Sequence, residues 1–235
     1  GHDGRDRAPG MARGAHRARG RVDGGPQFRI RRARMPDHGR GGDEDAIGVA
    51  DLAARALAGR EERLDHFHEI VVREAGDLAC ALFDQAAPQG SERASRKLDW
   101  AARLHEMGCL ISHSDSHRHG AYILDNTDAA GFAVPELHRL GVLVQGQRGK
   151  VRKLGVDLDD PIFVLQLLCL RLAVALCHAR RDPDTAGLAL QCNGQRFFVR
   201  TRAGWAAAYP QSAHLLREEA QAWQKTPWEL LIDLP

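Results

Sequence analysis

The sequence has few cysteines and no paired cysteine motif. Its five cysteines are odd in number, and no two of them form a Cys-x-x-Cys pair. Within an apolar helical pattern, cysteine behaves as a small hydrophobic residue. We therefore expect a reducing compartment, the cytoplasm or its inner-membrane surface, rather than a disulfide framework.

Long apolar runs are also missing. The first thirty residues contain no apolar segment like the central region of a secretory signal. The best candidate for a membrane span, Ile162 to Cys177, is too short and contains Gln166 and Arg171. The sequence predicts a buried core helix there and no membrane span.

Two familiar catalytic motifs are absent. There is no Gly-x-x-x-x-Gly-Lys-Ser/Thr phosphate loop and no Gly-x-Ser-x-Gly nucleophile elbow. The formal net charge of +2 does not demand a nucleic-acid partner, and we expect no specific one. The sequence therefore shows no complete catalytic constellation of its own.

Residues 1–77 are basic, rich in Gly and Arg, and have little apolar periodicity over the first 43 positions. Such a segment buries too little surface to offset the entropy of ordering, so we expect partial disorder. Residues 1 to about 43 are either a basic arm for a polyanion or sequence without a selected role, whereas residues 45 to about 83 are compatible with helix. A further hypothesis is that the first of these regions is translated out of its ancestral frame.

Hydrophobic periodicity predicts a mainly α protein for the rest of the chain. Trp100, Leu104, Met107 and Ile111 form one apolar stripe. Further helices are expected at about 135–145 and from Pro161 to about 178, where Asp159-Asp160-Pro161 is a strong helix start. The sequence predicts a helical domain over 78–183.

After residue 184 the spacing of apolar residues changes from one typical of helices to one typical of strands. Leu188–Cys192 and Arg196–Thr201 predict strands that flank an Asn193-Gly194-Gln195 turn. A helix over 213–223 and a third strand over 228–232 follow. We expect residues 184–235 to form a small α+β part with an antiparallel sheet.

The stretch from Leu104 to Tyr122 concentrates polar chemistry beside a core helix. A loop rich in histidine and a short helical turn at 121–124 are expected there. Metal ligands must converge in space, and neighbouring ligands on one helix occur in HD-type phosphohydrolases. The stretch is either a metal cluster or a hydrogen-bonded helix junction, and its candidate residues are His105, Glu106, His113, His117 and His119.

Basic residues near the ends of the predicted elements suggest anion binding. Long cationic side chains in such places can reach phosphates, and several of them bind a polyanion by summation. The alternative is a solvated basic surface. The candidate phosphate-binding residues are Arg118, Arg148, Lys150, Arg152 and Lys153.

Residues from about 78 to 232 resemble the C-terminal helical region of the exopolyphosphatase/guanosine pentaphosphate phosphatase (Ppx/GppA) family, closest to its exopolyphosphatase branch. The resemblance is carried by Trp100-Ala-Ala-Arg-Leu-His-Glu-Met-Gly, by His117-Arg-His-Gly-Ala-Tyr, by Arg148-Gly-Lys and by the apolar helix around Leu165. Family members often have a histidine at the position of Gln147.

The resemblance implies an HD-like helical domain followed by a small α+β part. It implies a hydrolase that releases terminal orthophosphate from inorganic polyphosphate, with actin-like catalytic domains and Mg²⁺ in the full-length proteins. This chain, which shows no such domains, would be truncated, would hold no cofactor and would be inactive alone. It would supply polyphosphate binding and homodimer contacts. The alternative is an independent HD-type metal-dependent phosphohydrolase that uses His105, Glu106, His117 and His119.

Overall fold

The computed structural model describes residues 62–89, 91–129, 131–177 and 185–235, with the side chains of 62–70 and of Ala186 left out. All of these residues belong to one compact unit that spans 39–235. The predictions for residues 1–61, including the basic arm, lie outside the described residues.

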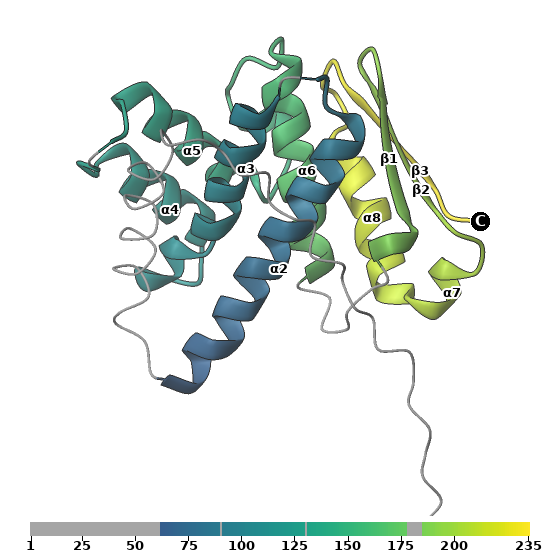
Figure 1. Cartoon of the computed structure of the whole chain (residues 1–235), viewed down its shortest axis with the longest axis horizontal. Helices are drawn as coiled ribbons and strands as arrows, with labels where there is room; N and C mark the ends of the chain where they lie inside the picture. The colour runs from purple at the N-terminus through teal and green to yellow at the C-terminus, as the bar shows by residue number, and fades with distance from the viewer. Residues whose placement is uncertain (1–61, 90, 130, 178–184) are drawn as a thin grey trace, which may run out of the picture. The chain divides into compact units, whose positions relative to one another are not determined.

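The described chain is mostly helical and ends in a small sheet (Figure 1). The helices that precede the sheet are α2 (Glu62–Ala86), α3 (Glu92–Leu104), α4 (Ser116–Asp125), α5 (Val134–Gly146) and α6 (Pro161–Cys177). Two short 3-10 turns, η1 (Met107–Leu110) and η2 (Val151–Lys153), join them. A third, η3 (Thr185–Gly187), leads into β1 (Leu188–Asn193) and β2 (Arg196–Thr201). The chain ends with α7 (Trp205–Ala208), α8 (Pro210–Ala222) and β3 (Glu229–Asp233). The expected mainly α class with a small C-terminal α+β part is confirmed.

Helix α6 is the centre of the packing, as its sequence predicts. It packs against α2, α3, α5 and α8, so a helix with apolar residues on every side buries nearly all of them. Its start is fixed by Asp160, whose Oδ1 accepts hydrogen bonds from the N–H groups of Ile162 and Phe163 at 3.0 and 3.1 Å. Burial acts to raise the pKa of Asp160, but hydrogen bonds from Arg139 and these N–H groups hold it below its ordinary value.

The described helices include none that is long and apolar enough to cross a membrane. Within the same residues, no disulfide is formed.

The C-terminal sheet is mixed rather than wholly antiparallel. β1 and β2 form the expected antiparallel hairpin, with Asn193 opposite Arg196. β3 pairs with β2 in parallel, with Phe197 opposite Leu230. The prediction of a wholly antiparallel sheet is wrong on this pair, because the connection through α7 and α8 returns the chain to the same end of the sheet.

Two local predictions around residues 104–122 are also corrected. Helix α3 ends at Leu104 and η1 follows, so the 3.6-residue period is lost; Ile111 is 55% exposed, whereas Trp100, Leu104 and Met107 are buried. Residues 116–120 belong to α4 rather than to a loop. This helix packs against α5 through buried Gly120, Ala121 and Leu124, and that packing favours the helix.

The proposed domain boundary at residue 77 falls inside a continuous helix. α2 runs without a break from Glu62 to Ala86, and Ala75 and Leu82, on either side of the boundary, share one core. Because α2 also packs against α3, α6 and β1, it joins the helical part to the sheet. The division at 77/78 and 183/184 stays a proposal.

Candidate phosphate-binding site

His105 lies at the junction where α3 ends. Its side chain is buried, and its Nδ1 is 2.6 Å from the carbonyl oxygen of Ala102. Because a carbonyl can only accept, Nδ1 carries the proton in this geometry. The other ring nitrogen, Nε2, is 4.0 Å from Oε1 of Glu106.

Gln147 joins this junction to the end of α5. Its Nε2 donates to the carbonyl oxygens of His105, at 2.7 Å, and Val144, at 3.0 Å. Gln147 is itself buried. The amide therefore ties together two helix ends that are separated by 42 residues in the chain.

Close glycine packing fixes the start of α4 against η1. A Cβ added to Gly108 would overlap the carbonyl group of Ser116 and lie 2.5 Å from the N of Gly120. A Cβ added to Gly120 would lie 2.8 Å from Cγ1 of Val144 on α5. This packing sets the position of the first turn of α4, which carries His117, Arg118 and His119.

The histidines do not assemble into a ligand set. His113 is exposed, and His117 and His119 are half-buried on α4. Across the described ranges, no group of three or more His, Cys, Asp or Glu side chains is placed to hold a metal ion. The histidine cluster thus provides no described geometry for the metal-dependent alternative.

The connection between α5 and α6 carries an exposed basic segment, which we define as residues 148–153. Its four cations are all exposed. Among the residues that the structure describes, none of the four is in an ion pair. They are Arg148, Lys150, Arg152 and Lys153.

A buried arginine holds the backbone that leads into this segment. Arg171 of α6 donates to the carbonyl oxygens of Gly146, at 2.5 Å, and Gly149, at 2.9 Å. Its Nε and Nη2 also donate to the two carboxylate oxygens of Glu219 on α8, at 2.6 and 3.0 Å. Since these bonds fix residues 146 and 149, they limit the positions open to Arg148 and Lys150.

Charges from α4 and the basic segment act on the same histidine. The pKa of His117 is lowered, first by burial; Asp115 opposes the shift, and Arg118, Arg148 and His119 add to it. Arg148 is thus close enough to the first turn of α4 to repel a proton there. An anion at this place would face Arg148 from the basic segment and Arg118 from α4, of which Arg118 is paired with Asp115 at 3.8 Å.

A cleft of about 510 Å³ lies beside the basic segment. Arg148 and Lys150 line one side of it, and α8 lines the other with Glu218 and Leu215. The paired Arg171 and Glu219 also line the cleft. The cleft gives the exposed cations a concave surface on which a linear anion could lie.

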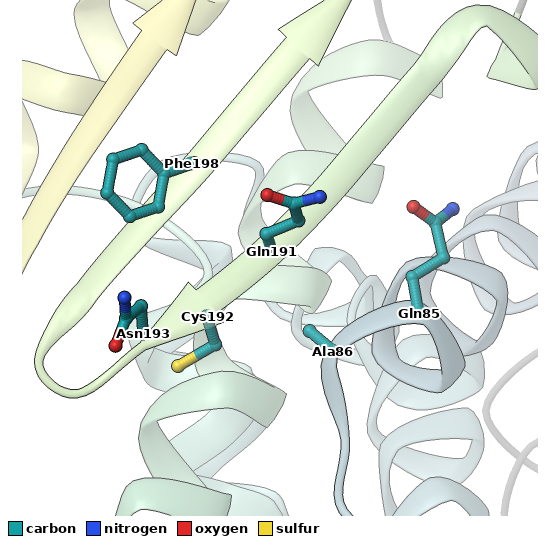
Figure 2. Close-up of a pocket in the computed structure, with 6 residues that line it drawn as sticks. All are labelled: Gln85, Ala86, Gln191, Cys192, Asn193 and Phe198. Carbon is teal, nitrogen blue, oxygen red and sulfur yellow. The ribbon is translucent and has the colours of Figure 1, made fainter.

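A second hollow, of about 540 Å³, has no charged lining (Figure 2). It lies between the end of α2 and the β1–β2 hairpin, and Gln85 there accepts a hydrogen bond from the N–H of Leu190 at 2.8 Å. Because no cation lines it, it does not fit a phosphate. Its lining residues are Gln85, Ala86, Gln191, Cys192, Asn193 and Phe198.

Sequence reasoning missed Arg171 and Glu219. In the sequence, Arg171 interrupts an apolar helix, and a charged side chain that is buried needs a partner. That signal could have identified Arg171 as a structural centre. It could not have identified Glu219, which lies 48 residues away.

Three curated proteins are similar in sequence to much of this chain. A protein of Aeromonas hydrophila is 29% identical over 194 residues, which cover 80% of this chain and 38% of the relative. A protein of Aeromonas salmonicida is 30% identical over a region that covers 71% of this chain and 34% of the relative. A protein of Pseudoalteromonas translucida is 29% identical over a region that covers 56% of this chain and 27% of the relative. All three are named guanosine-5'-triphosphate,3'-diphosphate pyrophosphatase.

The chain thus spans about a third of the length of these curated relatives. Their names do not select the exopolyphosphatase branch expected from the resemblance. Residues 64–77, which were expected to lie outside the resemblance, fall inside the region that matches the family. Residues 64–220 match the family described as Ppx/GppA phosphatase, domain III, and the chain therefore belongs to the Ppx/GppA phosphatase family.

Proposed function

We propose that this chain is the polyphosphate-binding portion of a Ppx/GppA phosphatase. The basic segment, with Arg118 of α4, would contact the phosphates. The observation that carries the proposal is the pair of hydrogen bonds from Arg171 to the carbonyl oxygens of Gly146 and Gly149, which fix the backbone on either side of exposed Arg148. A linear polyphosphate would lie along the cleft and bind through several charge-assisted contacts.

The parent reaction would be the hydrolytic release of terminal orthophosphate from inorganic polyphosphate. Phosphate release would depend on parts of such proteins that this chain does not span, with the Mg²⁺ that the family resemblance implies. The same resemblance supports a homodimer, and the cysteine pattern of the sequence favours a cytoplasmic location. The names of the relatives make guanosine pentaphosphate the competing substrate, and its phosphates offer the same chemistry.

The binding proposal is tested with fluorescently labelled polyphosphate and the full chain. The double variant Arg148→Gln/Lys150→Gln should bind about five- to thirtyfold more weakly, because each exposed charge contact contributes up to about 1 kcal/mol. The matched control is Arg196→Gln/Arg200→Gln, which removes two positive charges from the sheet, where each arginine pairs with an acid. Equal weakening in both double variants would contradict a specific site.

The division of labour is tested by assaying phosphate release with Mg²⁺. The wild-type chain should release no more orthophosphate than a boiled sample. If the wild-type chain releases orthophosphate with Mg²⁺ and stops when the Mg²⁺ is chelated, this chain is catalytic by itself. Unlabelled guanosine pentaphosphate, added as a competitor of the labelled polyphosphate, tests the choice of substrate.

A further inference from the structure

A small pocket lies between the N-terminal part of α3 and the start of α5, and it shares no residue with the basic segment or its cleft. Its volume is about 180 Å³. Its α3 side is one face of the helix, since the residues there are spaced by three or four positions. Its main lining residues are Arg93, Arg96, Lys97, Trp100, Phe132 and Glu136.

The pocket has an excess of positive charge. Three cations line it against the single carboxylate of Glu136. Lys97 and Arg93 both approach Oε1 of that carboxylate, at 2.8 and 3.3 Å. Arg96 forms no ion pair with any residue that the structure describes. One guanidinium is therefore uncompensated, and much of Arg93, 82% exposed, still faces solvent.

The carboxylate already has its partners. In addition to Lys97 and Arg93, Glu136 accepts a hydrogen bond from the backbone N–H of Ala133 at 3.4 Å. The hydrogen bond from Lys97 is the main reason that the pKa of Glu136 is lowered, so the group is ionised at neutral pH. Glu136 thus holds two cations in place and is not an open acceptor for a cationic ligand.

The floor of the pocket is aromatic. The rings of Trp100 and Phe132 meet edge to face, with centroids 5.0 Å apart and an angle of 70° between their planes. Trp100 is 8% exposed. An apolar floor reduces the access of water, and charge interactions are stronger where water is excluded.

Charge and size together select the ligand. Two thirteen-residue helices begin at the pocket, so the positive ends of their dipoles add to the three cations. A volume of about 180 Å³ is below that of pockets for drug-sized ligands, which start at roughly 300 Å³. A whole nucleotide would therefore not be enclosed, whereas a group with several anionic oxygens would fit the guanidinium donors.

We propose that the pocket formed by Arg93, Arg96, Lys97 and Glu136 over the Trp100–Phe132 floor binds a single phosphoryl group. The group is either free orthophosphate or the end of a phosphate chain, and both offer the same oxygens. Arg96 supplies the uncompensated guanidinium, Arg93 supplies a second donor, and Glu136 fixes the geometry of the cations. This site does not depend on the basic segment.

The test is calorimetric titration of the full chain in the Arg148→Gln/Lys150→Gln background, which removes two of the proposed polyphosphate contacts. Inorganic phosphate and pyrophosphate are the two probes. Tighter binding of phosphate selects the free ion, and tighter binding of pyrophosphate selects a chain end. Arg96→Gln should weaken binding of the preferred probe about tenfold, because it removes the uncompensated guanidinium.

The matched control is Arg103→Gln, on the same helix but paired with Asp99 at 2.8 Å. It removes the same charge and should leave phosphate affinity within twofold of the background. Equal weakening by Arg96→Gln and Arg103→Gln would overturn the proposal. No measurable binding of either probe would overturn it as well.

Discussion

Arg171 and Glu219 form an ion pair in the protein interior, with Nε of the arginine 2.6 Å from Oε1 of the glutamate. Both side chains are almost fully buried. The glutamate also accepts a hydrogen bond from the indole N–H of Trp223 at 2.7 Å. The pair therefore connects the central helix, the last helix and the backbone that carries the basic segment.

Replacing one partner of this pair should destabilise the protein strongly. Arg171→Met leaves the Glu219 carboxylate buried without its counter-ion, and a loss of about 3–5 kcal/mol in the free energy of unfolding is expected. Urea denaturation measures it. The double variant Arg171→Met/Glu219→Leu removes both charges and should recover most of the loss. A double variant as unstable as the sum of the two single variants would show that the two residues are not coupled.

Substitution of Gly108 tests the packing of η1 against α4. An added methyl group would overlap the Ser116 carbonyl, and backbone cannot move aside as a flexible side chain can. We expect Gly108→Ala to cost about 3 kcal/mol in stability. Gly141→Ala is the control, since its Cβ would lie 3.2 Å from Asp125 Oδ1 and 3.3 Å from the Ala121 carbonyl oxygen. Thermal denaturation should show a smaller loss of stability for Gly141→Ala than for Gly108→Ala, and equal losses would contradict the account.

His117 predicts a loss of stability in mild acid. Its pKa in the folded protein is below the ordinary value of 6.5, chiefly because of burial. The unfolded state therefore takes up the proton first, so the contribution of His117 to stability is present above about pH 6.5 and declines as the pH falls through its folded-state pKa. Urea denaturation between pH 7.5 and roughly pH 5 should show this decline, and His117→Gln should reduce it. A steeper decline in stability in the variant would contradict the prediction.

Metal analysis distinguishes the binding portion from the metal-dependent alternative. Since the described residues offer no cluster of three or more ligands, we expect the purified chain to contain metal well below one equivalent. His105→Ala should lower stability, because a buried side chain is removed, and leave the metal content unchanged. Stoichiometric metal that is lost in His105→Ala would instead support the HD-type phosphohydrolase.

Local sequence signals predicted much of the fold. The Asp160-Pro161 helix start, the apolar run of α6 and the Asn193-Gly194 turn each depend on neighbouring residues, and the structure confirms all three. The parallel pairing of β3 depends on the path of the chain through α8. The exposure of Ile111 depends on where α3 ends, which the periodicity did not indicate.

The candidate site was predictable only in part. Exposure of Arg148 and Lys150 follows from their chemistry and from their place in a polar connection. The partners that fix their backbone could not be predicted in this way, because the Arg171–Glu219 contact joins helices that are brought together only by tertiary packing. The proximity of Arg148 to His117 is of the same kind.

The salt dependence of polyphosphate binding tests the central claim most directly. Cations that neutralise a polyanion release its counterions, so the logarithm of the binding constant should fall linearly with the logarithm of the salt concentration. We predict a clear negative slope for the wild-type chain and a shallower slope for Arg148→Gln/Lys150→Gln, with Arg196→Gln/Arg200→Gln unchanged. A wild-type slope of zero, or a slope that the basic-segment variant leaves unaltered, would contradict the assignment of polyphosphate binding to residues 148–153.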